Sequence, residues 1–458
     1  MLRSIANTAL KGAYRRYTHV QVSAQPILRQ YSSDAASISI KRRPLPTTTS
    51  KEYTIPQDPY LLAKKFQQVV RGGNLDDAVA IVMQSKTRDQ SPVVWNLVIE
   101  EYARRGRLSR ALRAYTEMRR RGFTPTQTTY TAVLKACALG DSEKAVAIAE
   151  HTYASMSSSG VAPSIINMNS LLSVYQRKHD IERALQRFND LPSSGAMAPS
   201  LATYTILVSM CRRQITMLYE EQARLKPVDE HGAKVVLDIE QRTYNSQRIA
   251  AAKNDIRSTF ATVMQLWDMY TADAEQRLRE PAEDTHALAY DTRILKLVLK
   301  ACHALYEDER ELARKGFNII ARVYGGSRRV DAHGEVSFAL PLAARLRRTK
   351  DMGVDREAAS QHPILDKDVI DLAIGLCDRG KRYSNIVRLW SSLEKYFPAE
   401  LEPLQAQFAA EIAEFTVLAS APPDARRGKS AKLTLFRTRR LSAKNNNNAQ
   451  KKEEGETK

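Results

Sequence analysis

The 458-residue sequence lacks the signatures of several large protein classes. Its four cysteines lie too far apart for a local zinc motif, and their spacing does not suggest a disulfide framework. No stretch of about 20 apolar residues is present, so no transmembrane helix is expected. A Gly-rich phosphate loop, a nucleophile elbow and a His-Glu-x-x-His motif are also absent. We therefore predict no catalytic residue, no metal, no cofactor and no membrane insertion, and we predict that the protein is not an enzyme.

Acidic residues are absent from residues 1–33, where basic residues, Ser, Thr and Ala are frequent. The apolar residues there are spaced to lie on one side of a helix, which is the signature of a mitochondrial presequence. We predict a presequence over 1–31, cleaved before Ser32, and a location in the mitochondrial matrix; the alternative is a disordered basic tail. The proline-containing segment that follows, 32–58, is predicted to be a flexible linker.

The formal net charge of +19 points to a polyanionic partner, most simply nucleic acid. The alternative is a basic protein suited to its compartment, with a basic tail inflating the count. Basic residues concentrate at residues 104–121 and in the segment 421–458, which is predicted to be a disordered tail. Each of these two regions either grips RNA or is only solvated.

The sequence does contain a repeat with a period of about 35 residues. The segment that begins at Val93 is echoed by those that begin at Thr128, Ile166 and Ala202. Within a unit, two apolar runs at helical spacing are separated by a turn, such as the one at Gly106, and the second run ends at a Gly-x-x-Pro sequence. Each unit is therefore predicted to be a helix hairpin that must stack on its neighbours to bury both faces, giving an α-solenoid.

The units resemble pentatricopeptide repeats. The unit 92–126 shows the resemblance best, through Asn96, Gly106-Arg107-Leu108, Ala111-Leu112, Met118, Gly122 and Pro125. The resemblance implies an all-α fold, namely a right-handed α-solenoid of helix-turn-helix repeats. It places the array at 59–213, made of a degenerate unit 59–91, the units 92–126, 127–164 and 165–200, and the start of a further unit at 201.

The period is lost after Arg213, and residues 214–420 are predicted to be divergent helical repeats with an insertion. The insertion, 215–252, is charged and expected to be helical, and a displaced second helix is expected at Phe260–Trp267. Two further hairpins are expected, and a loop near 325–334 interrupts them. The expected hairpins pair 287–305 with 311–324 and 369–377 with 386–396.

Polar residues at the fifth position of each unit are the candidates for base contact. They are Asn96, Thr131, Asn169 and Thr205. Equivalent positions in stacked hairpins form a row, and short amide or hydroxyl groups can hydrogen-bond a base edge. The resemblance implies that this position separates purine from pyrimidine together with the last residue of the unit, which is Thr126, Ser164 or Ser200. It implies a pyrimidine-purine-pyrimidine-purine order; helix capping is the alternative role for the fifth-position residues.

Two more rows complete the candidate interface. The second position carries Val93, Thr128 and Ile166, which the resemblance assigns to flanking the bases; packing between hairpins is the alternative. The thirteenth position carries a row of guanidiniums suited to phosphate contact, which is broken in the unit 127–164. The row consists of Arg71, Arg104, Arg177 and Arg213. Phosphate contacts supply affinity and salt dependence rather than sequence choice, and simple solvation is the alternative.

By resemblance the protein is expected to be a monomeric, sequence-selective, single-stranded RNA-binding protein of mitochondria. The closest family role is that of a fungal factor in 5′-end maturation of small-subunit rRNA, within mitoribosome assembly. Its partners would then be mitochondrial RNA and the small ribosomal subunit. The alternatives are a factor in mRNA stability, splicing or translation, and a structural subunit of the mitoribosome. A helical scaffold that binds proteins is the alternative from a different class.

Overall fold

The computed structural model describes most of the chain between residues 45 and 420. The described residues are 45–225, 238–279, 288, 292–304, 309–325, 327–330, 336–339, 341–343, 365–379 and 383–420. The predicted presequence, 1–31, and the predicted tail, 421–458, lie outside them. The chain divides into two compact units, Met1–Ala304 and Leu305–Lys458.

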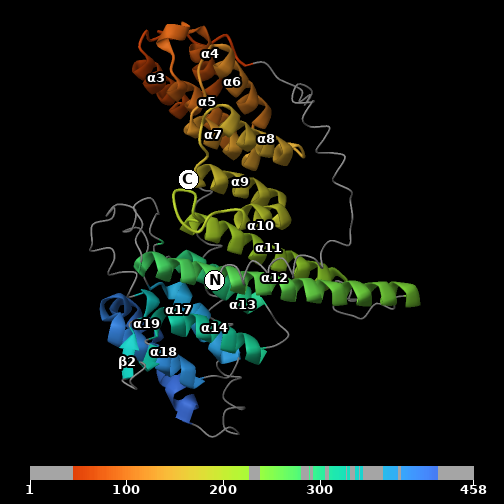
Figure 1. Ribbon diagram of the computed structural model, residues 1–458, viewed down its shortest axis with the longest axis vertical. Coiled ribbons are helices and arrows are strands. Elements are labelled where there is room, and N and C mark those ends of the chain that lie inside the picture. Colours follow the sequence, from red (N-terminus) through yellow and green to blue (C-terminus); the bar gives the residue numbers. More distant parts are fainter. Residues whose placement is uncertain are drawn as a thin grey trace, which may run out of the picture. The chain divides into compact units, whose positions relative to one another are not determined.

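The first unit begins with consecutive helix hairpins (Figure 1). The helices are α3 (Pro59–Arg71), α4 (Leu75–Gln84), α5 (Pro92–Arg104), α6 (Leu108–Arg120), α7 (Gln127–Leu139), α8 (Ala145–Ser158), α9 (Ile165–Lys178), α10 (Ile181–Asn189) and α11 (Leu201–Leu225). The first helices of the hairpins pack on one another, α5 on α7, α7 on α9 and α9 on α11, and form one layer. We call α3, α5, α7, α9 and α11 the first-helix layer. The predicted helix-turn-helix solenoid is confirmed here.

Local sequence explains where the helices of a hairpin end. Gly106 follows α5 with φ of 66° and Gly122 follows α6 with φ of 87°, a left-handed backbone that glycine adopts at little cost. In the unit 165–200 the corresponding turn uses His179, at φ of 59°. The next first helix then begins at a hydroxyl side chain, Thr126 or Ser164, as N-cap.

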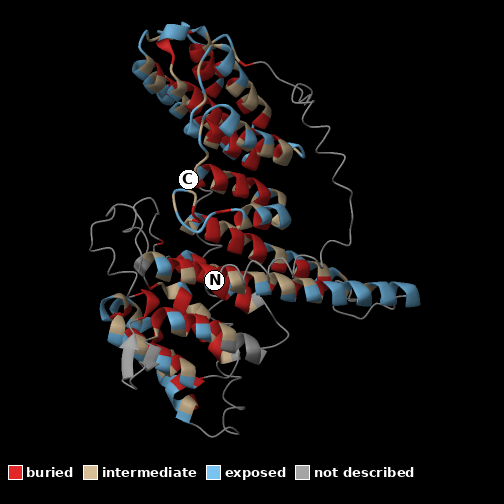
Figure 2. Cartoon of the chain, viewed as in Figure 1, coloured by how far each residue is buried: buried red, intermediate tan, exposed pale blue. Residues whose placement is uncertain are grey.

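The core of this unit lies between the two helices of each hairpin and between neighbouring hairpins. Aromatic side chains dominate it, and Trp95, Tyr102, Tyr130, Tyr175 and Tyr204 are each 0% exposed. Figure 2 shows the buried residues gathered along the inner sides of these helices. Because each aromatic ring packs against the following hairpin as well as its own, a single hairpin cannot bury its apolar surface alone.

The regular pairing changes after α11, which is 25 residues long. The next helix, α12 (Ile239–Arg279), has 41 residues, and its later half packs against α11. Val263 and Trp267 are buried there, so the displaced second helix expected at Phe260–Trp267 is confirmed. Residues near the start of α12 are mostly exposed, as Figure 2 shows, and they form the helical insertion that the charged sequence predicts.

The predicted pairing of 287–305 with 311–324 spans the boundary between the two units and stays a prediction. Helix α13 (Thr292–Ala304) belongs to the first unit and packs on α11 and α12. Helix α14 (Glu309–Tyr324) belongs to the second unit and packs on α17 (Lys367–Arg379) and α18 (Tyr383–Tyr396). Apolar periodicity predicted both helices, but it does not say which neighbour each one covers.

The second unit also contains α19 (Pro398–Ser420), which packs on α18. The predicted hairpin of α17 and α18 is confirmed, since these two helices pack together. Where a plain loop was predicted, strands β1 (Ser327–Val330) and β2 (Val336–Ala339) pair antiparallel. None of the described helices is both long and apolar enough to cross a membrane.

Residues 45–57, which we call the strap, differ from the prediction of a flexible linker over 32–58. The Ser50 N–H donates to Asp77 Oδ1 at 2.7 Å, and the Ser50 hydroxyl donates to Asp77 Oδ2 at 2.6 Å. Gln84 Nε2 donates to the Thr47 carbonyl at 2.8 Å. These three hydrogen bonds attach the strap to α4. The two from Ser50 also lower the pKa of Asp77, because they favour its ionised form.

Candidate nucleic-acid interface

The second-position side chains project from the first-helix layer. Val93 is 59% exposed, Ile166 is 63% exposed, and Thr128 is exposed as well. These values disfavour the alternative in which the residues pack between hairpins. Positions two and five of a helix lie three residues apart, so each second-position side chain neighbours the fifth-position side chain of its own unit.

The second-position row extends one unit further towards the N-terminus than the sequence predicts. Tyr60 occupies the second position of α3 and is 74% exposed. An exposed aromatic ring at this place offers a surface on which a base can stack. The sequence signal was present, since the unit 59–91 begins with the same Pro-x start as 92–126, but the unit lacks a polar fifth-position residue.

The fifth-position residues hydrogen-bond to the next unit. Thr129 Oγ1 donates to Asn96 Oδ1 at 2.7 Å. Asn167 Nδ2 donates to Thr131 Oγ1 at 2.9 Å. Thr203 Oγ1 donates to Asn169 Oδ1 at 2.6 Å. We call these three contacts the rungs, since each joins one first helix to the following one at the same register.

The residues that close the rungs are held by the N-caps of their own helices. The Thr126 N–H donates to Thr129 Oγ1 at 3.0 Å, and the Ser200 N–H donates to Thr203 Oγ1 at 3.0 Å. The Ser164 N–H donates to Asn167 Oδ1 at 3.1 Å. The last residues of the units, Thr126, Ser164 and Ser200, therefore cap these helices. The fifth-position residues, for which helix capping was the alternative role, do not.

The rung-closing residues Thr129, Asn167 and Thr203 were missed by the sequence reasoning. They stand at the third position of their units, where burial made them look like ordinary core positions. A signal was available, because the third position alternates Thr, Asn, Thr while the fifth position of the preceding units alternates Asn, Thr, Asn.

The fifth-position residues differ in accessibility. Asn96 is buried, at 8% exposure, whereas Thr131, Asn169 and Thr205 are half-buried. Thr205 donates to the Leu201 carbonyl at 2.8 Å within its own helix and closes no rung among the described residues. The half-buried members of the row therefore leave more room for a base than Asn96 does.

The thirteenth-position arginines do not behave alike. Arg71, Arg177 and Arg213 are exposed and form no ion pair with any other described residue. Arg104 is exposed too, but it pairs with Glu101 one turn earlier on α5. In the unit 127–164 the same register carries Leu139, which is 38% exposed, so the row is interrupted as predicted.

A histidine beside this row adds little positive charge. Burial and the nearby Arg213 guanidinium both lower the pKa of His179, so its imidazole is neutral at neutral pH. The cations of the row are therefore the arginines.

The arginines of 104–121 are engaged with acidic or aromatic side chains. Arg107 and Arg110 lie 3.9 and 2.8 Å from Asp76 Oδ1, and Arg105 lies 3.6 Å from Glu101. Arg119 lies over the ring of Tyr115 at 5.8 Å from its centroid. These contacts link α6 to α4 and α5, so this basic region is largely matched within the fold.

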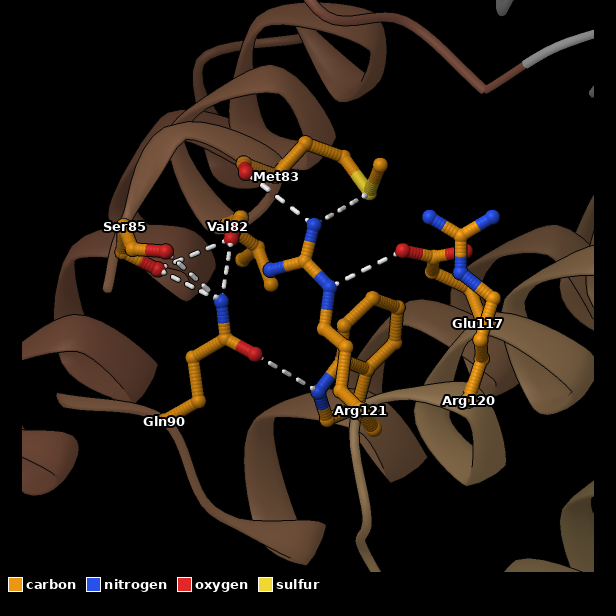
Figure 3. Close-up of polar contacts among 8 residues, drawn as sticks. Val82, Met83, Ser85, Gln90, Glu117, Arg120 and Arg121 are labelled. Carbon is orange, nitrogen blue, oxygen red and sulfur yellow. Dashed lines mark hydrogen bonds and ion pairs between the residues drawn. The ribbon is translucent and has the colours of Figure 1, made fainter. Parts of the chain in front are cut away.

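Arg121 is the most embedded of these arginines. Its Nε donates to Glu117 Oε1 at 3.0 Å, and its terminal nitrogen Nη2 donates to the Met83 carbonyl at 3.2 Å (Figure 3). Its guanidinium also lies 5.4 Å from the centroid of the Trp95 ring. Arg121 therefore connects three helices of two neighbouring hairpins.

Among the described residues, no group of three or more His, Cys, Asp or Glu side chains is placed to hold a metal ion. Cys137 and Cys211 are buried in the helix core, and burial raises the pKa of each thiol to about 12. These thiols are therefore protonated at neutral pH.

Comparison with known protein families bears on the region that contains the rungs. Residues 90–138 match the model of the PPR repeat family, and residues 152–213 match the model of the pentatricopeptide repeat domain. The matched segments include the residues of all three rungs.

Curated relatives share the repeats over part of the chain. A pentatricopeptide repeat-containing protein of Arabidopsis thaliana is 28% identical over 159 residues, which are 34% of this chain and 20% of the relative. A chloroplastic one from the same organism is 29% identical over 142 residues, which are 29% of this chain and 26% of the relative. The chain thus spans only about a fifth to a quarter of the length of these relatives.

Solved structures of the same family align at low similarity. The pentatricopeptide repeat protein PPR10 in complex with an 18-nt psaJ RNA element is 16% identical, with 83% of this chain and 58% of that chain covered at a TM-score of 0.30. At that TM-score the two chains do not superpose as whole molecules.

Proposed function

We propose that the protein binds single-stranded RNA along its first-helix layer. The observation that carries this proposal is the arrangement of three side-chain types on the same helices. Exposed apolar residues lie beside polar residues at fixed register, and exposed arginines without an acidic partner among the described residues stand at the thirteenth position of α3, α9 and α11. Single-stranded RNA offers three matching groups, since it presents base faces, base edges and phosphates.

Each type of side chain contacts a different part of the RNA, according to its chemistry. Val93 and Ile166 each offer an apolar surface against the face of an unstacked base. Thr131 and Asn169 offer hydroxyl and amide groups to a base edge. Arg177 and Arg213 offer guanidiniums to phosphates, a contact that contributes affinity and salt dependence without reading sequence.

We further propose that the RNA is mitochondrial and that the protein acts in 5′-end maturation of small-subunit rRNA. The acid-free, basic first 33 residues support the compartment, and the family resemblance supports the role. The mechanism is positional, because an array that covers one RNA segment defines the end that nucleases or ribosomal proteins meet. Binding to mRNA, a structural place in the small ribosomal subunit and a protein-binding scaffold are the competing roles.

Binding is tested with the purified chain and short single-stranded RNA, comparing wild type with Val93→Ala/Ile166→Ala. Both residues are exposed, so the double variant is expected to fold normally and to bind RNA more weakly by about 30-fold, because each substitution removes about 1 kcal/mol of apolar contact with a base. Val417→Ala is the matched control, since Val417 is a 55% exposed aliphatic residue of the second unit. Equal affinities of the wild type and the double variant would reject the proposed surface.

The target is tested by crosslinking the protein to RNA in intact mitochondria and sequencing the bound fragments. One dominant footprint at the 5′ end of the small-subunit rRNA precursor, weakened by the double variant, is the expected result. A footprint on mRNA would move the role to stability, splicing or translation. Crosslinks spread over mature ribosomal RNA and unchanged by the variant would instead indicate a structural subunit, and no crosslinks at all would favour a protein-binding scaffold.

A further inference from the structure

Each rung combines one asparagine with one threonine. Asn96 meets Thr129, Thr131 meets Asn167, and Asn169 meets Thr203. The order of the two residue types is reversed in the middle rung. The alternation along the fifth position is thus matched by an opposite alternation at the third position of the following unit.

Side-chain reach explains why the two residue types must differ within a rung. The functional group of asparagine lies one bond further from the backbone than the hydroxyl of threonine. A long and a short side chain close the gap at 2.7, 2.9 and 2.6 Å in the three rungs, whichever helix supplies the long one. Two threonines would leave the gap open, and two asparagines would overlap in it.

In the middle rung, the surrounding hydrogen bonds determine which atom of the Asn167 amide faces Thr131. Asn167 Oδ1 accepts from the Ser164 N–H at 3.1 Å, and a backbone N–H can only donate. Asn167 Nδ2 therefore faces Thr131 Oγ1 at 2.9 Å and the Gln127 carbonyl at 3.2 Å. Thr131 gives its own hydrogen to the Gln127 carbonyl at 3.0 Å, so it has only a lone pair left to offer to a ligand.

The two outer rungs leave a hydrogen-bond donor available for a ligand, where the middle rung leaves an acceptor. Asn96 and Asn169 accept from threonine hydroxyls through Oδ1. Their amide nitrogens therefore retain N–H groups, although Asn169 uses one of its two for Ser200 Oγ at 3.0 Å. Along the layer the groups that remain for a base are thus donor, acceptor and donor.

We propose that base selection is carried by these pairs across two repeats, with Thr129, Asn167 and Thr203 as positioning residues for Asn96, Thr131 and Asn169. The unit with Thr131 selects a base that donates from an amino group. The units with Asn96 and Asn169 offer an N–H donor to a base acceptor instead, so they do not require an amino group on the base. This inference rests on the proposed RNA binding of the same surface.

The experiment selects a randomised single-stranded RNA library on the full chain and compares the enriched motif of the wild type with those of three variants. Asn167→Thr introduces threonine, the residue type that takes part in the caps of the neighbouring first helices. Its side chain is too short to reach Thr131. Thr131→Asn/Asn167→Thr rebuilds the rung in the order of its neighbours. Thr116→Asn is the matched control, since it makes the same change at an exposed threonine of α6 that belongs to no rung.

The inference predicts a change at one motif position only. Asn167→Thr relaxes the preference at that position, the double variant no longer favours bases with an amino group there, and Thr116→Asn keeps the wild-type motif. In synthetic RNA, the wild type is expected to prefer the selected nucleotide about 3- to 10-fold over its analogue without the amino group, which is purine riboside for adenosine or inosine for guanosine. The double variant is expected to lose this preference.

Three results overturn the inference while leaving RNA binding intact. They are an unchanged motif in Asn167→Thr and in the double variant, an equal loss of affinity for all sequences, and selection of uridine by the wild type at the variant-sensitive position. If Asn167→Thr does not fold, the double variant is compared directly with the wild type. A wild-type protein that enriches no motif rejects base reading itself, and the inference with it.

Discussion

The first helices and the second helices of the array use the same residue type in different ways. The thirteenth-position arginines of α3, α9 and α11 are exposed and have no acidic partner among the described residues, whereas those around α6 contact Asp76, Glu101 and Glu117. The difference shows that a positive charge counted in the sequence is not always a charge available to a ligand. A short row of arginines on the first-helix layer is a better guide to the interface than the longer basic run at 104–121.

The largest effect on stability is expected from Arg121→Ala, because this side chain holds two hairpins together. The variant loses a charge-assisted hydrogen bond to Glu117, a hydrogen bond to the Met83 carbonyl and the contact with Trp95. We expect the free energy of unfolding to fall by about 2 kcal/mol in urea titrations. Arg120→Ala is the control, because its side chain is 80% exposed, and a similar loss in both variants would contradict the assignment.

The next effect concerns RNA binding and should appear without a loss of stability. Arg177→Gln/Arg213→Gln removes two exposed guanidiniums of the first-helix layer. If both contact phosphates, the slope of log K against log salt concentration becomes shallower by about 1.4, or about 0.7 for each contact with single-stranded nucleic acid. The measurement is a salt series of binding titrations, and Arg107→Gln/Arg110→Gln provides the same change of charge on the outer helices. Equal slopes for the two double variants would remove the distinction between the two sets of arginines.

A smaller and pH-dependent effect is expected at the strap. Hydrogen bonds from Ser50 lower the pKa of Asp77 below its ordinary value of 3.8, so the ionised form is favoured in the folded state. The stabilisation by this contact is fully present above the ordinary pKa and is lost as the pH falls through the lowered pKa of the folded state. Protection factors of residues 45–57, which are exchange rates corrected for the pH dependence of exchange in an unstructured chain, should therefore fall on acidification in the wild type and be low at all pH values in Asp77→Ala. Protection that is high and independent of pH in both proteins would show that Asp77 does not hold the strap.

The smallest effect is expected from the outer ion pairs themselves. Arg107→Gln/Arg110→Gln breaks contacts with Asp76, whose side chain is 58% exposed. Exposed pairs of this kind contribute about 0–1 kcal/mol, so we expect a change of less than about 1 kcal/mol in the free energy of unfolding. RNA affinity at fixed salt should hardly change. A loss of RNA affinity as large as that of Arg177→Gln/Arg213→Gln would place the outer helices in the interface.

Much of the fold could be predicted because it depends on local patterns. The spacing of Trp95, Tyr102 and Leu108 and the turn at Gly106 predict a hairpin, and a repeated hairpin predicts a solenoid. The prediction failed where an irregular segment finds a partner far along the chain, as Ser50 finds Asp77. Periodicity shows that a face is buried but does not say against what.

The candidate site divides in the same way. Repeat register predicts the rows at the second, fifth and thirteenth positions, and their contact with RNA stays a prediction. The pairing of Thr131 with Asn167 was not predicted, because these residues are 36 positions apart and belong to different units. The ion pair of Arg104 with Glu101 is local by contrast, since the two residues lie one turn apart on α5.

The sequence by itself determined that this chain stacks helix hairpins and that residues of one kind recur along one layer of helices. Both follow from local propensity and from the period, which act within a single unit. Only the tertiary structure decided which hydrogen-bonding groups remain free on that layer. A hydroxyl can satisfy only a few partners, and in the rungs those partners come from neighbouring units that the fold brings together.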